Sequence, residues 1–138
     1  TLSIRRPQAI RPWQHVLEPL AGYITLAERL WHEPTLPVAY NFGPVPNEAA
    51  TVREVIALAR QSYGRGEIHY DDDAQGPHEA DCLALETSIS RNVLSFYPRW
   101  SLMQAVQRTV LWYRSFHDGA EARSLCEADI AAYIDPPI

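Results

Sequence analysis

The stretch RPWQHVLEPL at residues 11–20 carries the most information about the fold. Pro12 biases the preceding residue away from helical geometry, so residues 11–16 are expected to form a short extended segment. From Leu17 to Trp31, apolar side chains recur at steps of three and four residues, which predicts an amphipathic helix. Pro19 falls in the first turn of this helix, where its missing N–H costs nothing. An extended segment that leads directly into a long helix indicates a mixed fold of helices and short strands.

The side chain of Arg11 is the strongest candidate for a ligand contact in this stretch. In an extended segment, the two-residue period places Arg11, Trp13 and His15 on one face. The planar guanidinium offers paired donors that suit phosphate oxygens. The alternative is that Arg11 pairs with a surface carboxylate and that Trp13 belongs to the core. Residue types alone favour this alternative.

Local signals predict further short elements along the chain. Thr51 with Glu54 can form a capping box for a helix that runs to about Tyr63 and stops at Gly64. Other helices are expected at residues 87–94, from Ser101 to about Phe116 with Gly119 as the stop, and from Ser124, capped with Glu127, to Ile134. Strands are expected at residues 2–5, 38–42, 67–70 and 82–85. The helically spaced Trp112, Tyr113 and Phe116 are expected in the core.

Composition fits one globular domain spanning residues 1–138, with 46% hydrophobic and 21% charged residues. The formal net charge of −5 argues against a nucleic-acid binder, although one phosphorylated small molecule needs only one or two arginines. All 12 basic residues are Arg, which excludes Schiff-base chemistry, a lysine-containing phosphate loop and a Tyr-x-x-x-Lys pair.

Several other site types lack support in the sequence. The six glycines are scattered, so no Gly-x-Gly-x-x-Gly dinucleotide fingerprint exists. The histidines and cysteines lack metal-ligand spacing, and no metal site is expected. Cys82 and Cys126 are interpreted as buried free thiols. We see neither a membrane span nor a signal peptide, so the expected location is the cytoplasm. Thr1 begins a strand-like segment, as if the sequence started inside a longer protein.

Five segments, in order, resemble one family. The stretch at residues 11–20, followed by Ala-Gly-Tyr, is similar to a signature of the CDP-glucose 4,6-dehydratases, which are extended short-chain dehydrogenase/reductases that act on sugar nucleotides. The other segments are YNFGP at residues 40–44, PHEA at 77–80, PRW at 98–100 and TVLWY at 109–113. The resemblance covers essentially the whole chain.

This resemblance implies the fold and the division of function. The chain would be an α+β, mainly helical substrate-binding domain with short strands, the C-terminal part of the enzyme. The absent Rossmann half would bind NAD and carry the catalytic Tyr and Lys. The family reaction oxidises C4 of the glucose unit, eliminates water across C5 and C6, and returns the hydride to C6. This chain alone would therefore be inactive, and separating it should expose an apolar surface.

The resemblance also implies which residues bind the CDP-sugar. Arg11 would contact the diphosphate, Ser3 and Arg5 would lie beside the base, and His78 and Glu79 would lie near the same pocket. No catalytic or cofactor-binding residue is expected in this chain. Thr51 falls where some relatives contact phosphate, but helix capping already explains it. The intact enzyme is expected to be a homo-oligomer. Two alternatives remain: part of another nucleotide-sugar epimerase or reductase, and a stand-alone binding module.

Overall fold

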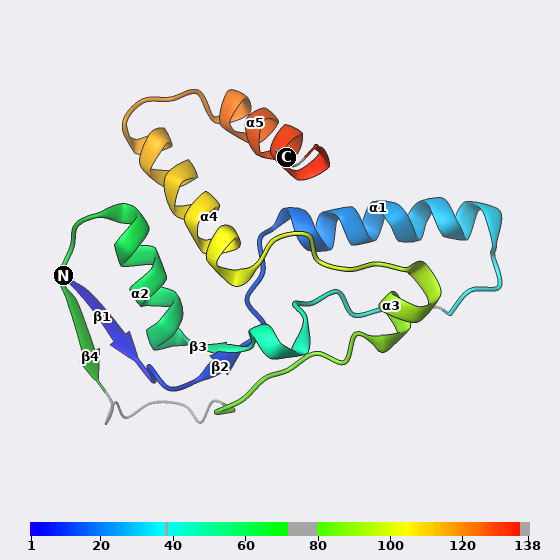
Figure 1. Cartoon of the computed structure of the whole chain (residues 1–138), viewed down its shortest axis with the longest axis horizontal. Helices are drawn as coiled ribbons and strands as arrows, with labels where there is room; N and C mark the ends of the chain where they lie inside the picture. The colour runs from blue at the N-terminus through cyan, green and yellow to red at the C-terminus, as the bar shows by residue number, and fades with distance from the viewer. Residues whose placement is uncertain (38, 72–79, 136–138) are drawn as a thin grey trace.

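The computed structural model describes residues 1–37, 39–71 and 80–135. They form an α+β arrangement of helices with short strands, as predicted (Figure 1). The helices are α1 (Leu17–His32), α2 (Val52–Tyr63), α3 (Ser88–Leu94), α4 (Leu102–His117) and α5 (Ala122–Ile134), with a 3-10 turn at Pro46–Glu48. The strands are β1 (Leu2–Arg5), β2 (Ile10–Arg11), β3 (Ala50–Thr51) and β4 (Ile68–Asp71).

The strands form two separate two-stranded sheets. Strand β1 pairs in parallel with β4, with Ser3 opposite His69 and Arg5 opposite Asp71. Strand β2 pairs antiparallel with β3, and Arg11 lies opposite Ala50. The β1–β4 pair, α2 and the β2–β3 pair lie at one end of the molecule, and α2 packs against α4 (Figure 1).

Helix ends largely follow the predicted local signals. Thr51 and Glu54 form the expected capping box of α2, and Gly64 ends that helix with a left-handed φ of 82°. Ser101 caps α4 through a second capping box, formed with Gln104. The expected cap at Ser124 is wrong, because α5 begins two residues earlier and the Glu121 carboxylate accepts from the first backbone N–H groups.

Two clusters of aromatic rings contribute to the core of the described residues. One surrounds Phe42, whose ring lies edge-on to Tyr23 and to Phe96. Gly22 lets α1 approach this ring, because a Cβ there would lie 2.4 Å from a ring carbon. The other cluster surrounds Trp100, where the start of α1, the start of α4 and the end of α5 meet.

Much of the predicted apolar stripe of α1 does not face the core. Ile24 is 71% exposed and Trp31 is 86% exposed, and Leu20, Tyr23 and Leu30 are also exposed. The residues of α1 that are buried are Glu18 and Gly22. An apolar stripe packs only if a neighbouring element covers it, and among the described residues α1 meets mainly α3. Exposed apolar side chains are therefore present on this helix.

Other core expectations are also wrong. Tyr113 is 57% exposed and Phe116 is exposed, while Trp112 is half-buried. Both cysteines are exposed free thiols, because the segments that carry them lie on the surface. In the described part of the chain, no helix has the length and apolar character needed to cross a membrane.

Two expected strands are not formed. Residues 39–42 of the segment predicted at 38–42 have no strand pairing, and residue 38 lies outside the described residues. The segment predicted at 82–85 is reduced to one bridge between Ile10 and Cys82. A strand needs a hydrogen-bonding neighbour along its length, and no described segment runs beside either stretch for more than that bridge.

Candidate functional site

Arg11 ends strand β2 and is half-buried. Its Nη1 donates to the backbone carbonyls of Ile10 (2.8 Å) and Ala80 (2.9 Å). These bonds fix the guanidinium at the edge where β2 meets the segment after residue 79. An anchored, partly exposed guanidinium suits phosphate binding, since less of its conformational freedom remains to be lost when a ligand binds.

The extended segment predicted at residues 11–16 is confirmed only at its first residue. The backbone N–H of Trp13 donates to the carbonyl of Arg11 at 3.0 Å, which turns the chain after the strand. The expected alternation of Arg11, Trp13 and His15 therefore does not apply. Trp13 Nε1 donates to the carbonyl of Ala50 (3.0 Å), and Gln14 Nε2 donates to that of Phe42 (2.9 Å). These side chains tie the segment to two distant parts of the chain.

His15 is buried beside Trp100, with the two ring centroids 4.7 Å apart. Its Nδ1 accepts from the backbone N–H of Leu17 (3.3 Å), and its Nε2 lies 3.9 Å from Oδ2 of Asp129. Burial lowers the pKa of His15 below 6.5, although the carboxylates of Asp129 and Glu18 oppose this shift. His15 is thus a neutral core residue at neutral pH, not a surface ligand.

Glu18 is the most heavily engaged side chain of the segment and is only 1% exposed. Its carboxylate accepts from the backbone N–H groups of Arg99 (3.0 and 3.2 Å) and Trp100 (2.9 Å), and from the hydroxyl of Tyr133 (2.6 Å). Burial and the bond to Glu18 raise the pKa of Tyr133 well above its usual value. The carboxylate thereby joins the start of α1 to the loop before α4 and to α5.

Our sequence analysis gave Glu18 no role. Glu is almost never fully buried without partners, and nothing in the sequence around Leu17 and Pro19 indicates that residue 18 is buried. The partners are more than 80 residues away in the sequence, so no local pattern identifies them.

The remaining predicted site residues are distributed over different places. Ser3 and Arg5 are exposed and alternate with the half-buried Ile4, so they share the outer face of β1. His78 and Glu79 lie outside the described residues. The described part of the chain contains no group of three or more His, Cys, Asp or Glu that could hold a metal ion.

Comparisons with known proteins agree with the resemblance. The chain is 36% identical over 132 residues to a CDP-glucose 4,6-dehydratase from Salmonella typhimurium. The chain is homologous to part of this dehydratase. The match covers 95% of the chain but only 37% of the Salmonella dehydratase. The predicted family resemblance is thereby confirmed over nearly the whole sequence, although no family model matches it.

The fold has a counterpart among solved structures. A dTDP-glucose 4,6-dehydratase from Bacillus anthracis, solved in complex with NAD, superposes with a TM-score of 0.65 at 20% identity. This match covers 89% of the chain and 37% of the Bacillus protein, in its C-terminal part. The chain therefore has the fold of the C-terminal part of a sugar-nucleotide dehydratase, and it spans little more than a third of either relative.

Proposed function

We propose that this chain is the nucleotide-sugar-binding part of an NAD-dependent 4,6-dehydratase, with CDP-glucose as the substrate and Arg11 as the ligand of its diphosphate. The observation that carries the proposal is the combination of the 36% identity over 95% of the chain with the placement of Arg11. Trp13, Gln14 and Glu18 are used to hold the segment together. Arg11 is half-buried and anchored to the carbonyl of Ala80, and a ligand can approach its partly exposed guanidinium.

Ser3 and Arg5 complete the proposed site on the exposed face of β1. In this arrangement they contact the base side of the nucleotide, through the backbone or the side chains. His78 and Glu79 lie outside the described residues, and their proposed place near the same pocket rests on the family resemblance. The contribution of this chain to catalysis is positional, because it grips the nucleotide and so orients the hexose for the reaction.

The residues of this chain do not fit a dinucleotide. None of the described glycines follows a strand and opens a helix, as a pyrophosphate-binding turn requires. We therefore assign NAD and the catalytic groups to the part of the enzyme that this chain does not span. The intact enzyme is proposed to be a cytoplasmic homo-oligomer.

The proposal is tested by calorimetric titration of the 138-residue chain with CDP. Arg11→Gln should weaken binding by roughly 10-fold or more, since a hydrogen bond between charged groups contributes about 1.5–3 kcal/mol. Arg114→Gln on the exposed side of α4 is the matched control and should leave the affinity unchanged. Equal affinities of the wild-type chain and Arg11→Gln would refute the role of Arg11.

The choice of nucleotide is tested separately. CDP should bind more tightly than UDP, GDP or dTDP in the same titration. A preference for dTDP would instead favour dTDP-glucose as the substrate of the intact enzyme. The chain alone should not dehydrate CDP-glucose when NAD is added. Turnover by the chain alone would show that catalytic groups are present after all.

A further inference from the structure

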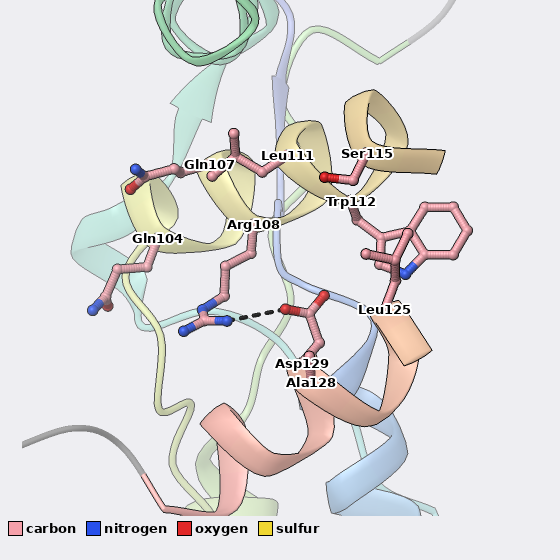
Figure 2. Close-up of a pocket in the computed structure, with 9 residues that line it drawn as sticks. All are labelled: Gln104, Gln107, Arg108, Leu111, Trp112, Ser115, Leu125, Ala128 and Asp129. Atoms are coloured by element: carbon pink, nitrogen blue, oxygen red, sulfur yellow. Dashed lines mark hydrogen bonds and ion pairs between the residues drawn. The ribbon is translucent and has the colours of Figure 1, made fainter. Parts of the chain in front are cut away.

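A pocket of about 390 Å³ lies between α4 and α5, outside the segment that carries Arg11 (Figure 2). Its volume falls in the range of small-molecule sites, roughly 300–1,000 Å³. The proposed function does not use this pocket, although two of its lining residues, Leu111 and Trp112, belong to the segment at 109–113 that resembles the dehydratase family. Its lining combines an ion pair, an indole ring, aliphatic side chains and uncharged polar groups, which together define the chemistry of a ligand.

The charged groups of the pocket neutralise each other. Arg108 Nη1 lies 3.0 Å from Oδ1 of Asp129, and Figure 2 shows this pair between the two helices. The guanidinium also lies over the ring of Trp100, 4.4 Å from its centroid. His15 Nε2 lies 3.9 Å from the other carboxylate oxygen. The Arg108 guanidinium and the Asp129 carboxylate are thus held in place before any ligand arrives. Because their charges cancel, the site has no net preference for an anion or a cation.

The ion pair retains hydrogen-bonding capacity toward the pocket. A guanidinium has five N–H donors and a carboxylate has about four acceptor positions, so one mutual bond leaves donors and acceptors side by side. The Arg108 side chain is 31% exposed and the Asp129 side chain 17% exposed, so a ligand in the pocket can reach both. Gln107 and Ser115 add uncharged polar groups to the lining.

The apolar part of the lining includes Trp112 on α4 and Leu125 on α5 (Figure 2). The indole of Trp112 stacks on Phe116 with ring centroids 5.4 Å apart and an interplanar angle of 22°. This contact holds the large apolar ring in position. The pocket therefore offers an apolar surface close to fixed hydrogen-bonding groups.

We propose that this pocket binds a neutral sugar ring in the pyranose form. A pyranose has hydroxyl groups around its rim, each able to donate and to accept, and an apolar face made of C–H groups. The hydroxyl groups match the donors and acceptors of the Arg108–Asp129 pair, whose charges cancel. The C–H face matches the apolar side chains of Trp112 and Leu125. The negative charge of Asp129 would repel a phosphate or a carboxylate, and the positive charge of Arg108 would repel a cation. The site is separate from the diphosphate site and does not depend on it.

The test uses methyl α-D-glucopyranoside and two-dimensional NMR of the ¹⁵N-labelled 138-residue chain. We expect saturable shifts of the Trp112 indole N–H signal and of backbone signals on α4 and α5. Asp129→Asn and Trp112→Leu should each weaken the apparent affinity by roughly 10-fold, the change expected when a charged hydrogen bond or a ring contact is lost. Trp31→Leu, at the exposed indole of α1, is the control and should bind as the wild-type chain does.

Three outcomes would overturn the proposal. They are the absence of saturable shifts, equal binding of glucosamine or glucuronate, and unchanged affinity in folded Asp129→Asn. Because Asp129 also contacts the core, Gln107→Ala serves as a second variant at an exposed position and should weaken binding by roughly 2–5-fold through loss of one neutral hydrogen bond. Unchanged affinity in Gln107→Ala together with unfolded Asp129→Asn would also count against the site.

Discussion

Removal of the Tyr133 hydroxyl tests the role of the buried Glu18 carboxylate. In Tyr133→Phe, the ring keeps its edge-on contact with Trp100 at 5.0 Å, while the 2.6 Å bond to Glu18 is lost. A buried hydrogen bond to a charged group contributes about 1.5–3 kcal/mol, so the free energy of unfolding should fall by about that amount. For a chain of this length, the Tm should fall by roughly 5–12 °C.

The measurement is urea unfolding followed by circular dichroism, with Tyr113→Phe as the control. Tyr113 is exposed on α4, so this substitution should change the free energy of unfolding by less than about 0.5 kcal/mol. Glu18→Ala should cost more than Tyr133→Phe, because it also leaves the backbone N–H groups of Arg99 and Trp100 without an acceptor. In the double variant, the two losses should not add, since both variants remove the same bond. If Tyr133→Phe and Tyr113→Phe were equally stable, the carboxylate would not hold α5 as described.

Three further predictions concern His15, Gly22 and Thr51. The pKa of His15 is lowered in the folded chain, so the unfolded chain binds more protons as the pH falls. The free energy of unfolding should therefore decrease as the pH drops below about 6.5. His15→Asn should flatten this part of a curve of denaturation against pH. Gly22→Ala should lower the Tm, because its Cβ would lie 2.4 Å from the Phe42 ring. Adding Phe42→Leu should restore part of the lost Tm. An unchanged Tm for Gly22→Ala would contradict this packing. Thr51→Ala removes the α2 cap and should cost about 1 kcal/mol in urea unfolding, whereas Thr51→Ser should cost much less.

The features predicted correctly are those set by neighbouring residues. The capping boxes at Thr51 and Ser101 and the left-handed stop at Gly64 need only side chains within one helical turn. Strand β1 was predicted from the alternation of its apolar and polar residues, and a strand was also expected at residues 67–70, where β4 runs from Ile68 to Asp71. The α+β class follows from these local elements taken together.

The features that were missed depend on what lies next to an element. The spacing of apolar residues correctly predicted the helix α1. Periodicity does not tell, however, which neighbouring element covers the apolar stripe. The segment at residues 39–42 has strand-forming residues, yet it has no paired strand among the described residues. In both cases the missing information is the identity of the neighbouring element, which local residue patterns do not contain.

The candidate site was predicted in part. The importance of residues 11–20 is a prediction from the sequence, and the structure gives several side chains of this segment structural roles. The structural roles of these side chains were not predictable from local patterns. Gln14 donates to a carbonyl 28 residues away, and Glu18 accepts from N–H groups more than 80 residues away. The roles of Ser3, Arg5, Arg11, His78 and Glu79 stay predictions until ligand binding is measured.

The parallel pairing of β1 with β4 sets an order of assembly. Leu2 lies opposite Ile68, so the first strand has to wait for 66 further residues to be synthesised before its backbone finds its partner. Closing so long a loop costs entropy that four residues of pairing repay poorly. We therefore expect α2 and α4 to pack first and the β1–β4 ribbon to close last, which leaves the backbone of β1 unpaired and accessible to proteases until late in folding.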